Sequence, residues 1–375
     1  MVNNPRHDPM RIHATLLGLA SATIALTSNY AVADTIYLLD GSSIPDVKIG
    51  SETFKEISYR AGSKSKTVKT DNVLRLEFTA KSPIVDRADT AAVEGQVLAA
   101  IDDFNVYLEG FLSDGRRPRF KWEPAYAMYR LVELNGMVGD VDALVASADL
   151  LIDKAPESRY LPMVYLAKAE AQFMSGKSPA AQKTLKEFLN LIQAKSLSRR
   201  WQVEQKLATI LFDSSIKGKD RISKLNAISD QAGEELPLVR NRAEVAIGEA
   251  LTGDKKFKEA EEIFGDITEN PQADQRTLAA AYTGLGDCLY YRANKSKGEA
   301  KQELLVEAAK AYMRVVVVYK DQSLYVPKAM FWAGRVFDAS TVEGDKAKAQ
   351  KLYGQVSRDY RGSQWATEAN AFRKR

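Results

Sequence analysis

The feature that most constrains the fold of this 375-residue chain is a helix-pair pattern that recurs through its second half. The clearest unit begins near Asn241 and carries Gly248, Ala260, Phe264 and Pro271. Two helices approach closely where a side chain is very small, so the glycine and the alanine are expected at the contact, with the phenylalanine filling the space beside it. Because proline cannot continue a helix, it ends the second helix. The pattern predicts a pair of packed antiparallel helices.

The two C-terminal units repeat a related signature. Tyr312-x2-Val315-x3-Tyr319 matches Tyr353-x2-Val356-x3-Tyr360, and each has an alanine four residues upstream and a glycine in the preceding helix. The loops within these units are longer than in the first, and Lys320 and Arg361 stand where the first has proline. Weaker units cover 128–156 and 165–188, and a degenerate one covers 201–229. Five helix pairs are expected, with the degenerate unit as a sixth.

This pattern resembles the tetratricopeptide repeat, which has a period of about 34 residues and an A-x3-F signature on its second helix. The resemblance implies a mostly α protein, with an α-solenoid of five to six helix pairs over 93–375. The C-terminal units resemble tetratricopeptide proteins of the bacterial cell envelope, in which the first helices line a groove that binds protein partners. Carried over by position, that groove would be lined by Arg242, Val245, Glu249, Lys328, Phe331, Arg335 and Asp338, all of which are ordinary surface positions if nothing binds.

Residues 1–33 have the composition of a secretory signal peptide. Basic residues precede a short apolar run, 14–26, and Ala31-Val-Ala33 has the form of a cleavage site. The run is shorter than the roughly 20 residues that span a bilayer, so the alternative is a buried N-terminal helix. Both Met1 and Met10 are possible starts. Because the single cysteine, Cys288, is far from the cleavage site, the expected product is a soluble periplasmic protein, not a lipoprotein.

Residues 34–79 differ from the rest and predict a small all-β, barrel-like module of four or five strands. β-Formers at 35–39 end at an Asp40-Gly41 turn, and apolar residues alternate with charged ones over 73–78. The segments D-T-I-Y-L-L-D-G and D-N-V-L-R-L-E-F resemble SH3-like or Sm-like modules. Some relatives of that fold bind RNA, but export and a net charge of only +4 favour a packing or docking role without nucleic acid. A linker is expected over 80–92.

The sequence is poor in residues for catalysis. The only histidines, His7 and His13, lie in the predicted signal peptide, so the exported protein would lack the commonest general base and metal ligand. Cys288, with no histidine to activate it, is expected to be a small buried residue. Gly284-Leu-Gly286 lacks the third glycine of a dinucleotide loop, so helix packing explains it better. We therefore expect no enzyme activity, no cofactor and no metal; a hydrolase built from distant carboxylates is the remaining catalytic alternative.

The segment 113–124 is a second candidate binding surface, because it interleaves cations with aromatic residues. Arginines bind carboxylates bidentately, and exposed aromatic rings anchor partners or stack on sugars. The competing interpretation is a solvated turn in which the tryptophan packs back on the next helix. The residues concerned are Arg116, Arg117, Arg119, Phe120, Lys121 and Trp122.

These observations predict a non-catalytic periplasmic scaffold or adaptor that binds protein partners through the groove of its helical repeats. The alternative is a binder of cell-wall or surface polysaccharide that uses 113–124, and a carboxylate-based glycan hydrolase is the third hypothesis. The sequence does not predict the partner, the envelope process or the oligomeric state.

Overall fold

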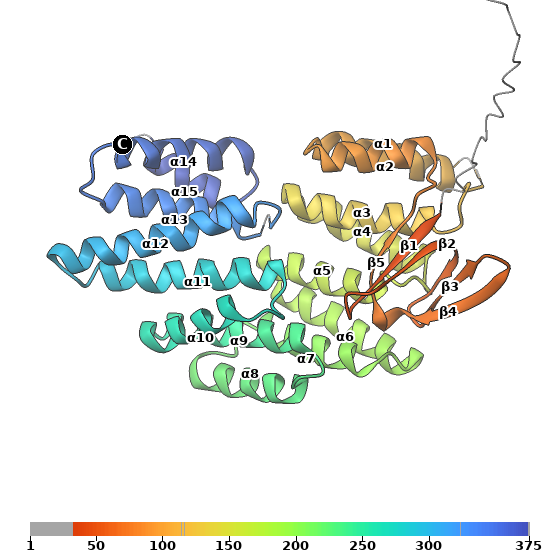
Figure 1. Ribbon diagram of the computed structural model, residues 1–375, viewed down its shortest axis with the longest axis horizontal. Coiled ribbons are helices and arrows are strands. Elements are labelled where there is room, and N and C mark those ends of the chain that lie inside the picture. Colours follow the sequence, from red (N-terminus) through yellow and green to blue (C-terminus); the bar gives the residue numbers. More distant parts are fainter. Residues whose placement is uncertain (1–32, 114, 116, 323, 374–375) are drawn as a thin grey trace, which may run out of the picture. The chain divides into compact units, whose positions relative to one another are not determined.

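The computed structural model describes residues 33–113, 115, 117–322 and 324–373, which form one compact unit (Figure 1). Within this part of the chain, a five-stranded antiparallel sheet is followed by fifteen α-helices. The expectation of a mostly α protein with an N-terminal β module is therefore confirmed. The predicted signal peptide and both histidines lie outside the described residues, apart from Ala33.

The sheet has the strand order β4-β3-β2-β1-β5, with β4 and β5 at its two edges. The alternating pattern of the sequence places Ile36, Val47, Ile57 and Tyr59 on a buried face. The expected turn follows β1, where Gly41 adopts a φ of +84° that glycine accommodates without strain. The strands are β1 Asp34–Leu38, β2 Ser43–Glu52, β3 Glu56–Ala61, β4 Lys64–Lys69 and β5 Val73–Glu77.

Each predicted helix pair corresponds to two consecutive, packed helices, from α3–α4 to α13–α14, and one further pair, α1–α2, precedes them. The helices are α1 Pro83–Val93, α2 Val97–Leu112, α3 Glu123–Val138, α4 Val141–Lys154, α5 Leu161–Met174, α6 Ser178–Lys195, α7 Arg199–Leu211, α8 Gly218–Ala232, α9 Pro237–Gly253, α10 Phe257–Glu269, α11 Gln275–Ala293, α12 Gly298–Val318, α13 Val326–Ala339, α14 Asp345–Asp359 and α15 Gln364–Arg373.

The expectation of a linker over 80–92 is wrong, because α1 occupies most of this segment. Pro83 stands at the start of that helix, where a missing N–H is tolerated, and does not mark a break. Val85, Ala88 and Ala91 recur at helical spacing and are buried against the following helices. The helical region therefore begins at Pro83, ten residues before the predicted start at 93.

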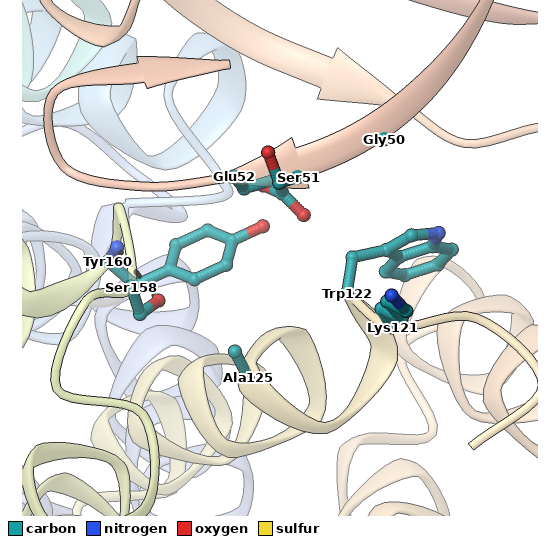
Figure 2. Close-up of a pocket in the computed structure, with 8 residues that line it drawn as sticks. All are labelled: Gly50, Ser51, Glu52, Lys121, Trp122, Ala125, Ser158 and Tyr160. Atoms are coloured by element: carbon teal, nitrogen blue, oxygen red, sulfur yellow. Dashed lines mark hydrogen bonds between the residues drawn. The ribbon is translucent and has the colours of Figure 1, made fainter. Parts of the chain in front are cut away.

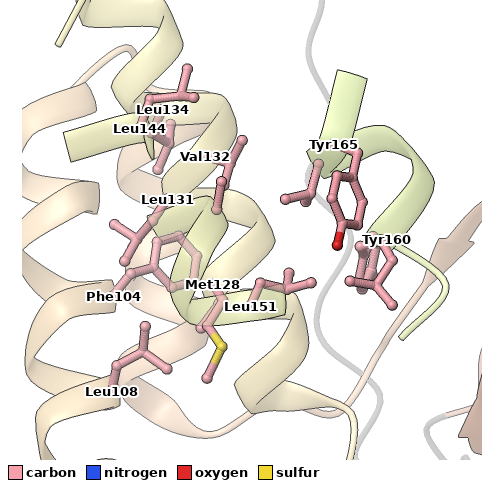
Figure 3. Close-up of a cluster of buried hydrophobic side chains, with 14 of the residues drawn as sticks. Phe104, Leu108, Met128, Leu131, Val132, Leu134, Leu144, Leu151, Tyr160 and Tyr165 are labelled. Carbon is pink, nitrogen blue, oxygen red and sulfur yellow. The ribbon is translucent and has the colours of Figure 1, made fainter. Parts of the chain in front are cut away.

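The odd-numbered helices form a continuous layer. Each of them, from α1 to α13, makes close contacts with the next odd-numbered helix as well as with its sequence neighbours. No comparable set of contacts joins the even-numbered helices in the described part of the chain. Apolar side chains between the layers build several cores, one of which surrounds Phe104, Met128 and Leu151 (Figure 3). Side chains on neighbouring odd-numbered helices are thereby brought side by side.

Glycines and aromatic rings meet where the sequence pattern predicts. A Cβ atom placed on Gly248 would lie 2.7 Å from the ring of Phe264, and one on Gly284 would lie 2.3 Å from the same ring. Gly286 has the same relation to Tyr312, and Gly334 to Tyr353. These glycines therefore allow rings from even-numbered helices to reach the odd-numbered layer. Cys288 is fully buried in the same region, as expected.

Two turns that are far apart in sequence also touch. The turn between α3 and α4 contains Gly139, and the turn between α14 and α15 contains Gly362. A Cβ atom on Gly362 would lie 3.0 Å from the carbonyl oxygen of Val138, so the two backbones are in direct contact. The C-terminal helices therefore fold back against an early pair, an arrangement that the repeat pattern does not predict.

Candidate functional site

Polar side chains of α5, α7, α9, α11 and α13 form two neighbouring groups of charges, which we together call the charged strip. Its cations come from α9, α11 and α13, and its acids from α5, α7, α9 and α11. The strip lies on the odd-numbered layer, where the groove was expected. Its members are Glu170, Glu204, Arg242, Glu249, Arg276, Asp287 and Lys328.

One half of the strip is built on arginine. Arg242 of α9 forms an ion pair with Glu204 of α7, and Arg276 of α11 pairs with Glu170 of α5 at 2.6 Å. Burial, together with the positive charge of Arg276, lowers the pKa of Arg242 to about 10. Because the two guanidinium groups repel each other, an additional carboxylate would be stabilised near them.

The other half of the strip is built on Lys328 of α13. Its ammonium group donates a 2.7 Å hydrogen bond to Oδ2 of Asp287. The other carboxylate oxygen of Asp287, Oδ1, accepts a 2.6 Å hydrogen bond from the hydroxyl of Tyr312. Burial opposes the charged form, but the Asp287 carboxylate outweighs this effect and raises the pKa of Lys328. The Glu249 side chain is exposed, but neighbouring helices surround its base. This partial loss of water raises the pKa of the carboxyl group, and the positive charge of Lys328 opposes the rise.

The acids of these pairs are deeper than the cations. The exposed fractions of the Glu204 and Asp287 side chains are 6% and 13%, whereas those of their partners Arg242 and Lys328 are both 30%. For the third pair the values are 28% for Glu170 and 44% for Arg276. In each of the three pairs the acid is therefore less exposed than its cation, whereas the acid Glu249 is exposed and the Nε and Nη2 atoms of Arg242 are buried.

Aromatic side chains border the strip on α11 and α13. Tyr291 is 40% exposed, stacks on Phe257 at a centroid distance of 5.4 Å, and approaches Trp332 at 6.1 Å. Burial and the nearby charge of Asp287 raise the pKa of Tyr291. Arg335 lies over the Phe372 ring and 5.8 Å from Trp332. Exposed aromatic area beside fixed charges is typical of surfaces that bind peptides.

The groove residues predicted from the sequence lie in three different environments. Arg242, Glu249 and Lys328 belong to the charged strip, and Arg335 lies at its aromatic border. Val245 and Phe331 are buried, with exposed fractions of 6% and 2%, because they face the neighbouring helices; they are core residues and not binding residues. Asp338 accepts a hydrogen bond from Tyr353. The acids that position the cations, Glu170, Glu204 and Asp287, were not predicted.

The segment 113–124 does not present Trp122 to solvent. The indole is 7% exposed and stacks on Phe78 of the β module at a centroid distance of 3.6 Å. The interpretation of Trp122 as an exposed anchor is therefore wrong, because the ring packs between the sheet and α3. Phe120 is half-buried beside it, while the basic residues of the segment, Arg117, Arg119 and Lys121, remain exposed. Arg116 lies outside the described residues.

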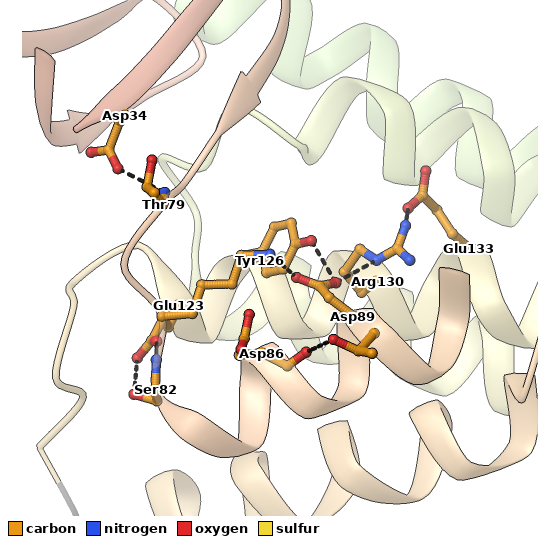
Figure 4. A network of polar contacts seen from close by, with 11 residues as sticks. Asp34, Thr79, Ser82, Asp86, Asp89, Glu123, Tyr126, Arg130 and Glu133 are labelled. Atoms are coloured by element: carbon orange, nitrogen blue, oxygen red, sulfur yellow. Dashed lines mark hydrogen bonds and ion pairs between the residues drawn. The ribbon is translucent and has the colours of Figure 1, made fainter. Parts of the chain in front are cut away.

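A polar network at the start of the helical region was also missed (Figure 4). Glu123 is fully buried and accepts hydrogen bonds from the backbone and hydroxyl of Ser82, at 2.5 Å and 2.7 Å. On the neighbouring turn, Tyr126 donates to Asp89. The only sequence signal was the Ser82-Pro pair, which is typical of a helix start. These contacts fix α1 to α3 and have no role in the charged strip.

A further charge pair, which is buried, lies where the β module meets the helices. Glu52 at the end of β2 and Arg159 before α5 are 3.8 Å apart, with side chains 6% and 8% exposed. Burial raises the pKa of Glu52 to about 7, against the opposing effects of Arg159 and of a hydrogen bond from Tyr160. The carboxyl group therefore binds a proton more tightly in the folded chain than in the unfolded chain.

This shift predicts a pH dependence of stability. Between the ordinary pKa of 4.5 and about 7, the folded chain holds a proton on Glu52 that the unfolded chain has lost. The free energy of unfolding is therefore expected to fall as the pH rises through this window. Urea unfolding at a series of pH values tests this, with Glu52→Gln as the matched variant. A Glu52→Gln protein with the same pH slope as the parent would contradict the assignment.

No group of three or more histidine, cysteine, aspartate or glutamate side chains in the described ranges is placed to hold a metal ion. Of the helices described, none combines the length and apolarity that crossing a bilayer requires. Comparison with protein-family models and with curated protein sequences finds no match to the chain. The charged strip is therefore interpreted from its own chemistry.

Proposed function

We propose that this chain is a non-catalytic scaffold or adaptor that binds an acidic segment of a protein partner along the charged strip. The observation that carries the proposal is the set of three cations on α9, α11 and α13, each of which is more exposed than the acid that pairs with it. A partner carboxylate would bind the exposed part of these cations through charge-assisted hydrogen bonds. The aromatic border around Tyr291 and Trp332 supplies apolar area for the same segment.

The tetratricopeptide-like pattern supports this proposal, because such helical repeats use their first helices to bind extended or helical segments. The predicted signal peptide supports a location in the bacterial periplasm. The absence of histidine beyond residue 33 of the sequence supports a non-catalytic role, since it removes the commonest general base. The β module, which packs on the helices through Phe78 and Trp122, would serve as a second docking element.

Photo-crosslinking in intact cells tests the site. A crosslinking amino acid replaces Glu249, which is exposed on the strip, or Lys310 of α12, whose side chain is 67% exposed on an even-numbered helix. We expect at least tenfold more crosslinked partner from position 249. Mass spectrometry is expected to map the crosslinks to aspartate- and glutamate-rich segments. Equal crosslinking from both positions, or mapping to basic segments, would contradict the proposal.

A paired substitution tests the charges without leaving a buried acid unpaired. Lys328→Gln combined with Asp287→Asn removes one ion pair, while the new amide oxygen can still accept the Tyr312 hydrogen bond. Crosslinking from position 249 is expected to fall at least tenfold, because a charge-assisted contact contributes about 1.5–3 kcal/mol. The matched control is Arg87→Gln with Asp103→Asn, a bidentate pair between α1 and α2 away from the strip. This control is expected to leave crosslinking unchanged.

A further inference from the structure

The outer edge of the β module concentrates positive charge. Residues 53–70, which contain β3 and β4, carry five cations and one acid, so this short segment has the same net charge, +4, as the whole chain. The rest of the chain is therefore neutral as a whole. All five cations have exposed side chains, and they are Lys55, Arg60, Lys64, Lys66 and Lys69.

These cations have no acidic partner within ion-pair distance in the described part of the chain, unlike the three cations of the charged strip. Lys48 of β2 lies directly opposite Arg60 of β3, and like charges at such a cross-strand position destabilise a sheet. The one acid of the segment, Glu56, lies opposite Lys69. The segment therefore has unused capacity to bind anionic groups.

The strand β4 is also a free edge of the sheet. It pairs with β3 on one side, and among the described elements β3 is its only extensive contact (Figure 1). Its side chains are exposed apart from that of Val68, which is half-buried. An edge strand presents a row of backbone N–H and C=O groups that an extended peptide can pair with.

Contacts with the helices hold this edge in place. The ring of Tyr160 points toward the end of β2 (Figure 2). The backbone N–H of Phe54, before β3, donates a 3.1 Å hydrogen bond to the carbonyl oxygen of Glu157. The indole N–H of Trp201 donates one of 3.1 Å to Asp71, just after β4. Because the base of the β3–β4 hairpin is fixed at both ends, a ligand would not have to order it.

The charges restrict what can bind at this edge. A second copy of the chain, added through its own β4, would bring the lysines of both copies together. Nucleic acid would find no exposed ring for base stacking within 53–70, since Phe54 and Tyr59 are buried. A flat anionic bilayer would leave the backbone edge unpaired. It would also meet only one face of the strand, whereas Lys66 and Lys69 project from opposite faces.

We propose that the free edge of β4 binds an acidic, extended segment of a partner protein as an added strand. Backbone hydrogen bonds supply affinity for any extended chain, and the cations select one with aspartate or glutamate opposite Lys64, Lys66 and Lys69. Residues of paired strands oppose one another singly, so successive acids of the partner would be two and three residues apart. This site does not depend on the charged strip.

Fluorescence polarisation with the full chain tests the proposal. The labelled probe is a peptide of alternating threonine and valine in which glutamates replace the residues opposite the three lysines. We expect saturable binding that weakens as salt is added, because the charges are exposed. Hydrogen exchange is expected to slow at the backbone amides of β4. The paired variant Lys328→Gln with Asp287→Asn should bind the probe like the parent, which separates this edge from the charged strip.

Three comparison probes distinguish strand addition from simple charge attraction. The same peptide with a methylated backbone keeps its charges but cannot pair as a strand, and a version with lysine in place of glutamate reverses them. Neither is expected to bind. Equal binding of the methylated peptide would overturn the proposal. So would binding of phosphatidylglycerol vesicles without binding of the glutamate peptide, which would assign the edge to a membrane surface.

A triple variant, Lys64→Gln with Lys66→Gln and Lys69→Gln, locates the site. Binding of the glutamate peptide is expected to weaken about tenfold, because three exposed charge pairs each make a modest contribution. Circular dichroism verifies that the variant is folded. Undiminished binding in the folded variant would place the peptide elsewhere and overturn the assignment.

The matched control removes the same charge away from the sheet. It changes three exposed lysines of α8, α10 and α14 to glutamine and is expected to bind the glutamate peptide like the parent. An equal loss of binding in this control would attribute the effect to net charge and contradict a site on β4. The control positions are Lys219, Lys258 and Lys346.

Discussion

Replacing Gly284 with valine is expected to destabilise the helical region by about 3 kcal/mol, because it overpacks a filled contact. A Cβ atom at this position would lie 2.3 Å from Phe264 Cζ, far inside van der Waals contact. The ring cannot move away, since Phe264 is fully buried and Gly248 already contacts it from α9. Urea unfolding followed by circular dichroism measures the change as a lower midpoint.

Gly265→Ala on α10 is the matched control for this experiment. Gly265 belongs to a helix interior, and a Cβ atom there would have no neighbour within 4 Å. Alanine is therefore expected to stabilise the chain by roughly 0.5–1 kcal/mol, since it reduces the backbone entropy of the unfolded state. If the valine variant unfolded at the parent midpoint, α9, α10 and α11 would not pack as closely as described.

Trp122→Ala is expected to destabilise the chain by about 3–5 kcal/mol, the range for truncating a buried aromatic side chain. The indole stacks on Phe78 and contacts Tyr126 edge-on at 5.4 Å, so its loss opens a void between the β module and α3. Calorimetry measures the drop in unfolding temperature. Limited proteolysis is expected to cut first near 79–82, between the module and α1.

This experiment separates two interpretations of Trp122. An exposed anchor for a polysaccharide would tolerate alanine within about 0.5 kcal/mol, as surface positions do. Arg119→Gln in the same segment is the control, since Arg119 is exposed and its guanidinium lies over the neighbouring Phe120 ring. A Trp122→Ala protein as stable as the parent would restore the role of this segment as a binding surface.

Several elements follow from local sequence alone. Strands were predictable because apolar residues alternate over 73–78 and because Asp40-Gly41 specifies a turn. The helix pairs were predictable because Gly248 and Phe264 lie close enough in sequence for their spacing to report a contact. The helix α1 was missed because 80–92 was assigned to a linker, although Pro83 in that segment is a residue that is also common at the first position of a helix.

The candidate site was predicted only in part. Spacing placed Arg242, Glu249 and Lys328 on the first helices of their pairs, and the structure brings them into one strip. Val245 and Phe331 were assigned to the same surface but are buried. Position within a repeat identifies the helix and its approximate face, but the rotation that separates an exposed side chain from a buried one depends on the neighbouring helices.

The sequence by itself determined the helix pairs, because small and aromatic residues within one unit select their own partners over short separations. Only the tertiary structure decided how the units meet. Arg276 pairs with Glu170 across 106 residues, and the Gly139 and Gly362 turns touch although no motif links them. Such contacts depend on the small rotation between successive units, which accumulates along the chain and is not encoded in any single repeat. The charged strip, which follows the stacking of the odd-numbered helices, is therefore a property of the folded chain.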